Sequence, residues 1–169
     1  MVGDGAKNPG AKRLAVTSDD VVEWTRSFVR HPSPQTERFE HEPQVQSFIT
    51  DQVVPLLRKL ALPWRRDGMG NLLVELGPER SDRSLMLMAY AMTHPANRML
   101  NPYAGELIED SAGVHIRGRG VSEQKGSLVA ALAAGWTRLS AAKLSARAVR
   151  LWRTRTIRVF VFMGCPCRS

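Results

Sequence analysis

The chain has 169 residues, of which 43% are hydrophobic, and its formal net charge is +8. This length supports one domain with a core of its own and excludes two ordinary domains. No stretch approaches the roughly 20 apolar residues of a membrane-spanning helix, and the polar first ten residues lack the apolar segment of a signal peptide, so we expect a cytoplasmic protein without a membrane partner.

The positive charge lies at one end of the chain. Residues 137–169 contain eight of the 24 basic residues and no acidic residue, whereas the residues before them carry 16 basic and 16 acidic side chains. Basic runs usually form solvated surfaces, and no recognised nucleic-acid-binding motif accompanies this one, so nucleic acid is not favoured as a partner. A module that binds nucleic acid or an acidic partner through this basic segment is the alternative function.

The first half of the chain predicts a disordered leader, residues 1–15, followed by two helical segments. Thr17 and Ser18 are both suitable N-caps for a helix that ends before the proline-containing residues 31–34. Pro43 opens a second segment, in which apolar residues recur at helical spacing and Pro55 introduces a kink.

Strands dominate the predictions after residue 66. A turn at residues 67–70 leads into a strand over 71–76, and the almost wholly apolar residues 84–91 predict a central strand covered on both faces. Helices that alternate with strands indicate an α/β fold. The remaining elements are expected to be a hairpin of residues 105–109 and 114–117, a helix over 125–139 capped by Ser122 or a neighbour, and a last strand over 156–163.

A glycine-rich turn, residues 118–127, precedes the expected long helix. It fails the dinucleotide template because Glu123 stands where glycine is needed, and it fails the P-loop template because the order is Lys125-Gly126-Ser127. Glu123 is the candidate functional residue of this turn, because a carboxylate there can face the strand-end crevice in which open α/β sheets bind ligands. The preference of acidic residues for a first helical turn explains it equally well.

Tyr90, Met92 and His94 occupy alternate positions where the apolar strand ends, so up to that end they would share one face. One histidine does not make a metal site, which typically has three or four ligands. From spacing alone we expect a core tyrosine, a core methionine and a surface histidine.

At these two stretches the sequence resembles the dinuclear-zinc metallohydrolases, the family of aminoacylase, acetylornithine deacetylase, succinyl-diaminopimelate desuccinylase and glutamate carboxypeptidase. The family pattern is an apolar strand, His-x-Asp-x-Val-Pro, a loop, a short hairpin, and Gly-Arg-Gly-x-x-Asp-Met-Lys-Gly opening an Ala-rich helix. The resemblance implies a layered α/β/α zinc-exopeptidase-like domain with a mixed sheet flanked by helices. The matching motif positions are Tyr90, Met92, Gly118, Arg119, Gly120, Glu123, Lys125 and Gly126.

In the family the motif histidine binds one zinc, the aspartate two residues later orients it, and the aspartate of the second motif bridges both metals. Tyr90, Met92 and Glu123 stand at those positions here. The resemblance therefore implies Glu123 as a candidate metal ligand, and His94 is a candidate replacement for the missing histidine if the loop folds back. No catalytic residue is assigned.

The resemblance also implies zinc as the family's cofactor, a small amide or peptide as substrate, and a homo-oligomer as an open possibility. The family's further glutamates and its distal histidine would follow the last strand, where this sequence ends. We therefore predict a truncated, inactive hydrolase homologue, with residues 16–140 as a partial catalytic-type domain. Residues 141–169 are expected to be a basic tail that is either non-native, the product of a shifted reading frame, or poorly ordered apart from the strand over 156–163. An active form with rearranged ligands, some supplied in trans, is the alternative within the family.

Overall fold

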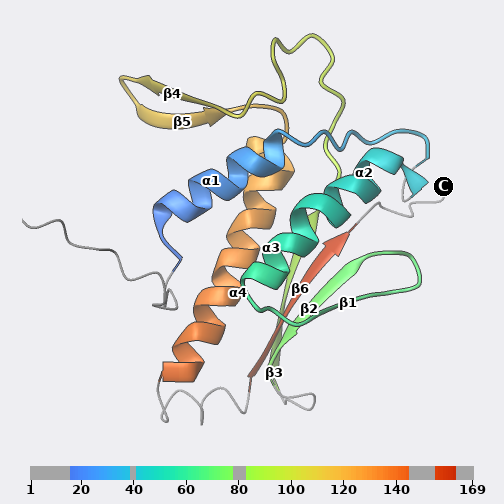
Figure 1. Ribbon diagram of the computed structural model, residues 1–169, viewed down its shortest axis with the longest axis vertical. Coiled ribbons are helices and arrows are strands. Elements are labelled where there is room, and N and C mark those ends of the chain that lie inside the picture. The colour runs from blue at the N-terminus through green and yellow to red at the C-terminus, as the bar shows by residue number, and fades with distance from the viewer. Residues whose placement is uncertain (1–15, 39–40, 78–82, 145–154, 163–169) are drawn as a thin grey trace, which may run out of the picture.

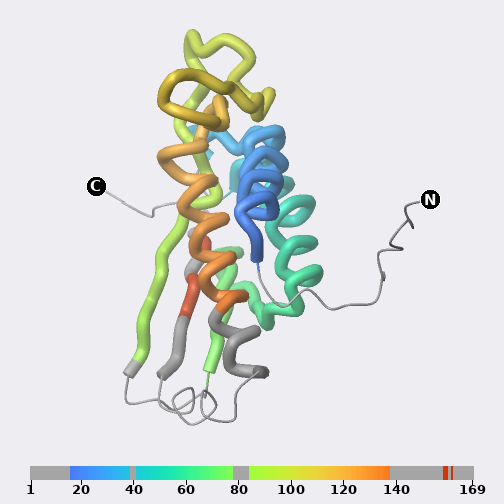
Figure 2. The backbone as a smooth tube through the Cα atoms, turned by 90° about the vertical axis from the view of Figure 1, so that its left-hand side faces the viewer, coloured from blue at the N-terminus to red at the C-terminus, as the bar shows by residue number. Residues whose placement is uncertain are grey.

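The computed structural model describes residues 16–38, 41–77, 83–144 and 155–162. Helices form one layer and a mixed sheet forms the other, which confirms the α/β class (Figure 1). In Figure 2 the strands lie on one side of the molecule and the helices on the other. Within the described ranges, no helix is both long and apolar enough to cross a membrane.

The first helix, α1 (Ser18–Val29), begins where the sequence predicts. The side chain of Thr17 accepts a hydrogen bond from the backbone N–H of Asp20, and the carboxylate of Asp20 accepts one from the N–H of Thr17. This reciprocal pair satisfies two backbone donors and contributes about 1 kcal/mol to the stability of a helix. The helix ends at Arg30, before the prolines.

The second helical segment contains a π-helical turn directly before its internal proline. It consists of α2 (Pro43–Phe48), the π-helical turn η2 (Ile49–Val53) and α3 (Val54–Lys59). A proline lacks the N–H that an α-helix requires and clashes with the preceding turn, and a wider π turn relieves both. Pro55 thus lies inside a helical segment whose geometry changes just ahead of it.

The sheet has the order β1-β2-β6-β3, in which β3 and β6 are parallel and the other neighbours are antiparallel. The last predicted strand is therefore an inner strand of the described sheet. The short strand β1 was not predicted, because three residues show too little alternation to be recognised. The four strands are β1 (Trp64–Arg66), β2 (Leu72–Leu76), β3 (Arg83–Tyr90) and β6 (Arg155–Phe162).

The prediction that residues 84–91 form a central strand covered on both faces is wrong. β3 lies at the edge of the described sheet, and Leu85, Met86 and Met88 are 55%, 53% and 62% exposed. Ala89, by contrast, is buried in the core. Whether the outer face of a strand is covered depends on a second layer of helices. A short apolar run does not record whether that layer is present, so it cannot distinguish a strand covered on both faces from one covered on a single face.

A hairpin and a long helix connect β3 to β6. The hairpin of β4 (Glu106–Asp110) and β5 (Gly113–Arg117) forms as predicted. A second π-helical turn, η3 (Val121–Lys125), leads into α4 (Gly126–Leu144), which extends beyond the predicted end. Ser122 does not cap this helix: it lies within η3, whose N-cap is Gly120, and no side chain caps the turn.

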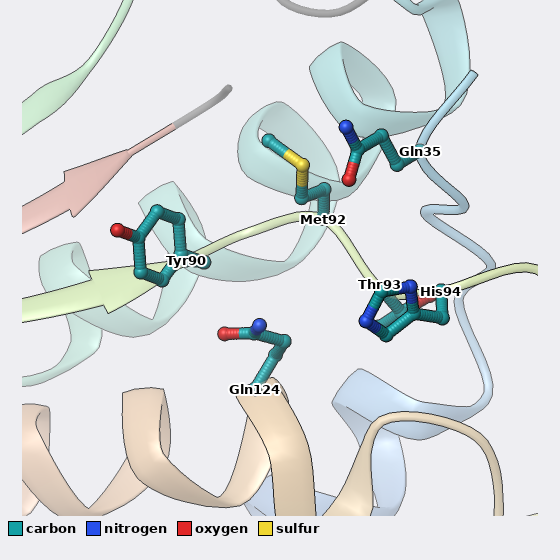
Figure 3. A pocket seen from close by; sticks show the side chains of 6 residues that line it. All are labelled: Gln35, Tyr90, Met92, Thr93, His94 and Gln124. Atoms are coloured by element: carbon teal, nitrogen blue, oxygen red, sulfur yellow. The ribbon is translucent and has the colours of Figure 1, made fainter. Parts of the chain in front are cut away.

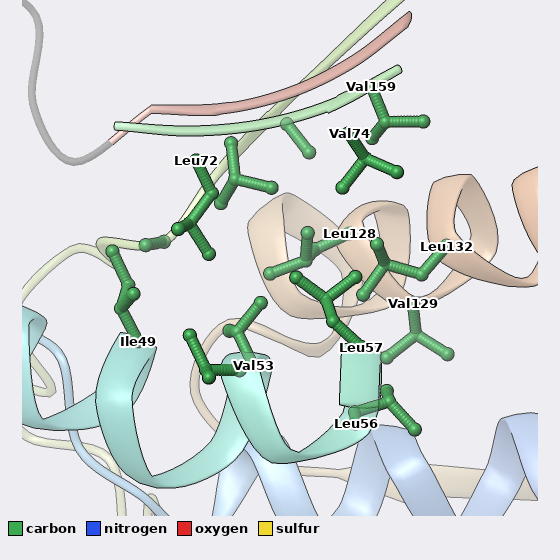
Figure 4. Packing of buried hydrophobic residues seen from close by; sticks show 14 of the residues in the cluster. Ile49, Val53, Leu56, Leu57, Leu72, Val74, Leu128, Val129, Leu132 and Val159 are labelled. Atoms are coloured by element: carbon green, nitrogen blue, oxygen red, sulfur yellow. The ribbon is translucent and has the colours of Figure 1, made fainter. Parts of the chain in front are cut away.

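The core lies between the sheet and the helices (Figure 4). Leu72, Val74 and Val159 project from the strands towards Leu128 and Leu132 of α4. Apolar side chains of η2 and α3, among them Ile49, Val53 and Leu57, belong to the same core. The parallel strands β3 and β6 end at the same edge of the sheet, where η3 and the loop after β3 also lie. This edge is the place at which a ligand site is expected.

The exposed face of β3 can be tested by truncating one side chain on each side of the sheet. Met88→Ala should change the free energy of unfolding by less than about 0.5 kcal/mol, because Met88 is exposed. Leu132→Ala, at a fully buried position, should cost about 2–5 kcal/mol. Urea denaturation of both variants measures the difference. Equal losses would show that the face of Met88 is covered in solution.

Candidate functional site

A pocket of about 170 Å³ lies at the end of β3, beside the turn that opens α4 (Figure 3). Tyr90 and Met92 enter it from the strand end, His94 from the following loop and Gln124 from η3. The end of the apolar strand, with Tyr90 to His94, and the glycine-rich turn, with Gln124, therefore line the same pocket. The lining residues are Gln35, Tyr90, Met92, Thr93, His94 and Gln124.

One wall of the pocket is built by a short parallel bridge between distant segments. The N–H of Thr93 donates to the carbonyl of Ser33 at 2.8 Å, and the N–H of Gln35 donates to the carbonyl of Thr93 at 2.7 Å. The hydroxyl of Ser33 donates to the carbonyl of Ala91 at 2.7 Å and extends this pairing. These bonds bring Gln35 to the pocket, and nothing in the sequence around Gln35 indicated that position.

The carboxylate of Glu123 is held by the protein itself. Its Oε1 accepts the backbone N–H of His94 at 3.2 Å, and its Oε2 lies 3.6 Å from Nη1 of Arg119. Arg119 in turn donates to the carbonyl of Ala96 at 3.4 Å. Glu123 therefore fastens the loop after β3 to the turn before α4.

The two predicted metal ligands, His94 and Glu123, are thus neighbours, but the imidazole of His94 is not the group that contacts the carboxylate of Glu123. His94 meets Glu123 with its backbone N–H, while its side chain lines the pocket. Glu123 is not among the lining residues. Their joint role as metal ligands stays a prediction.

The three strand-end residues differ in burial. Met92 is 6% exposed and belongs to the core cluster, as predicted. His94 is exposed, also as predicted, whereas Tyr90 is only partly buried and lines the pocket, so the expectation of a core tyrosine is wrong. The strand ends at Tyr90, and a residue at a strand end can turn its ring towards the crevice.

Lys125, the residue after Gln124, is fully buried. Its Nζ donates to the carbonyl of Phe28 at 2.7 Å and to the carbonyl of His31, and it lies 4.2 Å from the ring centroid of Phe48. The cation therefore satisfies carbonyl groups at the C-terminal end of α1, where positive charge is favoured. Desolvation lowers the pKa of Lys125 to about 7.

His31 belongs to a chain of polar groups that the sequence did not indicate. The hydroxyl of Ser47 donates to Asp51 at 2.9 Å and lies 2.8 Å from Nε2 of His31. Since the hydroxyl hydrogen is used on Asp51, Nε2 must be the donor in the second bond. Burial lowers the pKa of His31, the charge of Lys125 lowers it further, and Asp51 opposes the shift.

Close packing explains two glycines of the motif. Gly120 has a φ of 89°, and a Cβ there would lie 2.6 Å from Cγ2 of Thr93. A Cβ on Gly118 would lie 2.3 Å from Cγ1 of Val29. Only glycine lets the turn approach α1 and the pocket wall this closely.

Among the residues that the structure describes, no three His, Cys, Asp or Glu side chains gather into a group that could hold a metal ion. At the strand end, Tyr90 presents a phenol and Met92 a thioether. Neither matches the imidazole, carboxylate and thiolate ligands that zinc takes in proteins. The described donor set therefore does not fit a two-zinc centre.

Solved structures similar to this chain are peptidases. Human carnosine dipeptidase 1 aligns with a TM-score of 0.58 and 18% identity over 86% of this chain and 32% of that chain. The M20 family metallo-carboxypeptidase Sso-CP2 from Sulfolobus solfataricus aligns with a TM-score of 0.60 and 12% identity over 86% of this chain and 31% of that one. The dipeptidase Dug1p from Saccharomyces cerevisiae aligns at 0.52 with 13% identity, over 85% of this chain and 32% of Dug1p.

This chain has part of the M20 metallopeptidase fold. It spans about a third of the length of the solved structures that it resembles. No family model and no curated protein matches the sequence. The resemblance seen in the sequence is thus confirmed at the level of the fold, while zinc, deacylase activity, a homo-oligomer and a cytoplasmic location stay predictions. The expected leader and most of the expected tail lie outside the described residues.

The close approach at Gly120 predicts a large effect of one methyl group. Gly120→Ala and Gly113→Ala both place alanine at positive φ, but a Cβ at Gly113 meets nothing within 4 Å. The first variant should therefore lose at least about 1 kcal/mol more than the second, because it adds a clash to the backbone strain. Thermal or urea unfolding measures both, and equal losses would contradict the packing described here.

The burial of Lys125 predicts a pH-dependent stability. Lysine titrates near 10.5 in the unfolded chain and at about 7 in the folded protein. Between these pH values the unfolded chain holds a proton that the folded protein lacks, so the free energy of unfolding rises with pH across this window. Relative to Lys125→Met, the wild type should gain stability from pH 7 to pH 10. Urea titrations at several pH values test this, and a constant difference between the two proteins would contradict it.

Proposed function

We propose that this chain is a homologue of the M20 metallopeptidases that binds a small amide or peptide ligand at the strand-end pocket without hydrolysing it. The observation that carries this proposal is the identity of the strand-end residues. Tyr90 and Met92 stand where the family has a metal-binding histidine and the aspartate that orients it. The scaffold of the site is kept and its metal chemistry is not.

Ligand chemistry supports the loss of metal binding. A thioether cannot accept the proton of an imidazole, so Met92 cannot perform the orienting role of the aspartate. A neutral phenol is a poor replacement for an imidazole ligand of zinc. The one motif carboxylate that remains, Glu123, cannot replace both missing groups.

The surroundings of Glu123 support the same proposal. A cation bound at its carboxylate would lie close to the guanidinium of Arg119, which is 3.6 Å from Oε2. Like charges at such separations repel by about 4 kcal/mol at the effective dielectric constant typical near a protein surface. A metal ion would therefore have to displace Arg119, and the loop contacts of Arg119 would be lost with it.

The pocket itself supports a binding role. It lies at the carboxyl ends of parallel strands, the place where open α/β sheets bind ligands. Its polar and apolar lining comes from several elements that backbone hydrogen bonds hold together. The peptidase fold of the similar structures makes a small amide or peptide the ligand class to test first.

Metal analysis tests the proposal. Purified protein is incubated with zinc, dialysed and analysed by plasma mass spectrometry, together with the double variant Tyr90→Met, Glu123→Gln. The zinc content of the two proteins should be equally low, because neither residue is a working ligand. Dipeptide hydrolysis should stay at the level of the buffer for both. Stoichiometric zinc in the wild type that disappears in the double variant would show that the proposal is wrong.

A further inference from the structure

We propose that the ligand of the strand-end pocket is an uncharged amide, held by the side-chain carboxamides of Gln35 and Gln124. This inference rests on the proposed binding function and specifies the ligand class. It follows from three properties of the pocket: its unpaired polar groups, its charge and its size.

Three of the polar side chains that line the pocket are unpaired within the described residues. Within the described part of the chain, the side chains of Gln35, His94 and Gln124 make no hydrogen bond with other protein groups. Gln52, by contrast, is bound by Ser27 at 2.8 Å. The three groups come from separate segments, yet Figure 3 shows them around one space. Polar side chains that converge on a pocket typically fix the orientation of a ligand.

Both carboxamides are positioned by backbone contacts. Gln35 follows the parallel bridge to Thr93, and the N–H of Gln124 donates to the carbonyl of Gly120 at 3.1 Å. Each carboxamide offers a donor and an acceptor. A second amide, with its own N–H and C=O, complements both of them at once.

The lack of charged groups in the lining favours an uncharged ligand. No carboxylate, ammonium or guanidinium group is among the lining residues. The nearby carboxylate of Glu123 is occupied by Arg119 and by the N–H of His94. A charged ligand would lose its hydration in the pocket without gaining an opposite charge, which is unfavourable.

The size of the pocket limits the ligand to one small group. Its volume of about 170 Å³ is below the roughly 300–1,000 Å³ of pockets for drug-sized ligands. The thioether of Met92 and the ring of Tyr90 supply apolar contacts beside the carboxamides. An amide with short flanking groups meets these conditions.

Two probes that differ in one group test the inference. N-acetylglycinamide is uncharged, whereas N-acetylglycine has nearly the same shape and ends in a carboxylate. With protein labelled at the methionine methyl groups, titration followed by NMR should shift the Met92 signal, while that of Met69, outside the pocket, stays fixed. The uncharged probe should bind at least about tenfold more tightly, a difference of 1.4 kcal/mol. Equal affinities, tighter binding of the carboxylate, or no binding of the uncharged probe would overturn the inference.

Variants assign the binding to the two glutamines. Gln35→Met and Gln124→Met should each weaken binding of N-acetylglycinamide by about three- to tenfold, the effect of losing a neutral hydrogen bond. Gln44→Met, at an exposed position of α2 outside the pocket, is the matched control and should change nothing. Unchanged affinity in both pocket variants would overturn the inference. If a pocket variant does not fold, the selectivity of the wild type between the two probes decides.

The proposed function and this inference are contradicted by different results. Zinc retention or peptide hydrolysis by the wild type would contradict the absence of metal chemistry, whichever probe binds. Failure of the uncharged probe, with no zinc bound, would remove the ligand class and leave the non-hydrolytic assignment standing.

Discussion

The buried contact of Lys125 with the end of α1 is the interaction on which the site depends. Its Nζ holds the carbonyl groups of Phe28 and His31. It thereby joins the start of α4 to the segment that runs from α1 to the pocket wall. That segment pairs with Thr93 and delivers Gln35. Because Lys125 follows Gln124 in η3, fixing one side chain under the turn directs its neighbour towards the pocket.

The turn before α4 and the end of β3 are held in place by different contacts. Close packing fixes the glycines and Lys125, since any larger or shorter side chain would disturb α1 or leave carbonyl groups unsatisfied. Met92 packs in the core and Tyr90 lines the pocket, so each is held by contacts of its own. The turn and the strand end thus bring different groups to this edge of the sheet: packed glycines and a buried lysine from the turn, a phenol and a thioether from the strand end.

Local signals explain which parts were predictable. The N-cap at Thr17, the turn before β2 and the hairpin of β4 and β5 each depend on neighbouring residues, and each forms as predicted. The exposed face of β3 depends on whether a second layer is present, which no local pattern records. The same limit applies to Gln35, which reaches the pocket only through its pairing with Thr93. For Glu123 the sequence indicated the position, but only the structure shows its engagement by Arg119.

The proposed lack of zinc at the strand end is tested most directly by anomalous diffraction at the zinc absorption edge, on crystals grown with excess zinc. We predict no ordered zinc between Tyr90, Met92 and Glu123, with Arg119 still beside the carboxylate of Glu123. Two anomalous peaks about 3.5–4 Å apart at this position, the separation of a two-metal centre, would contradict it.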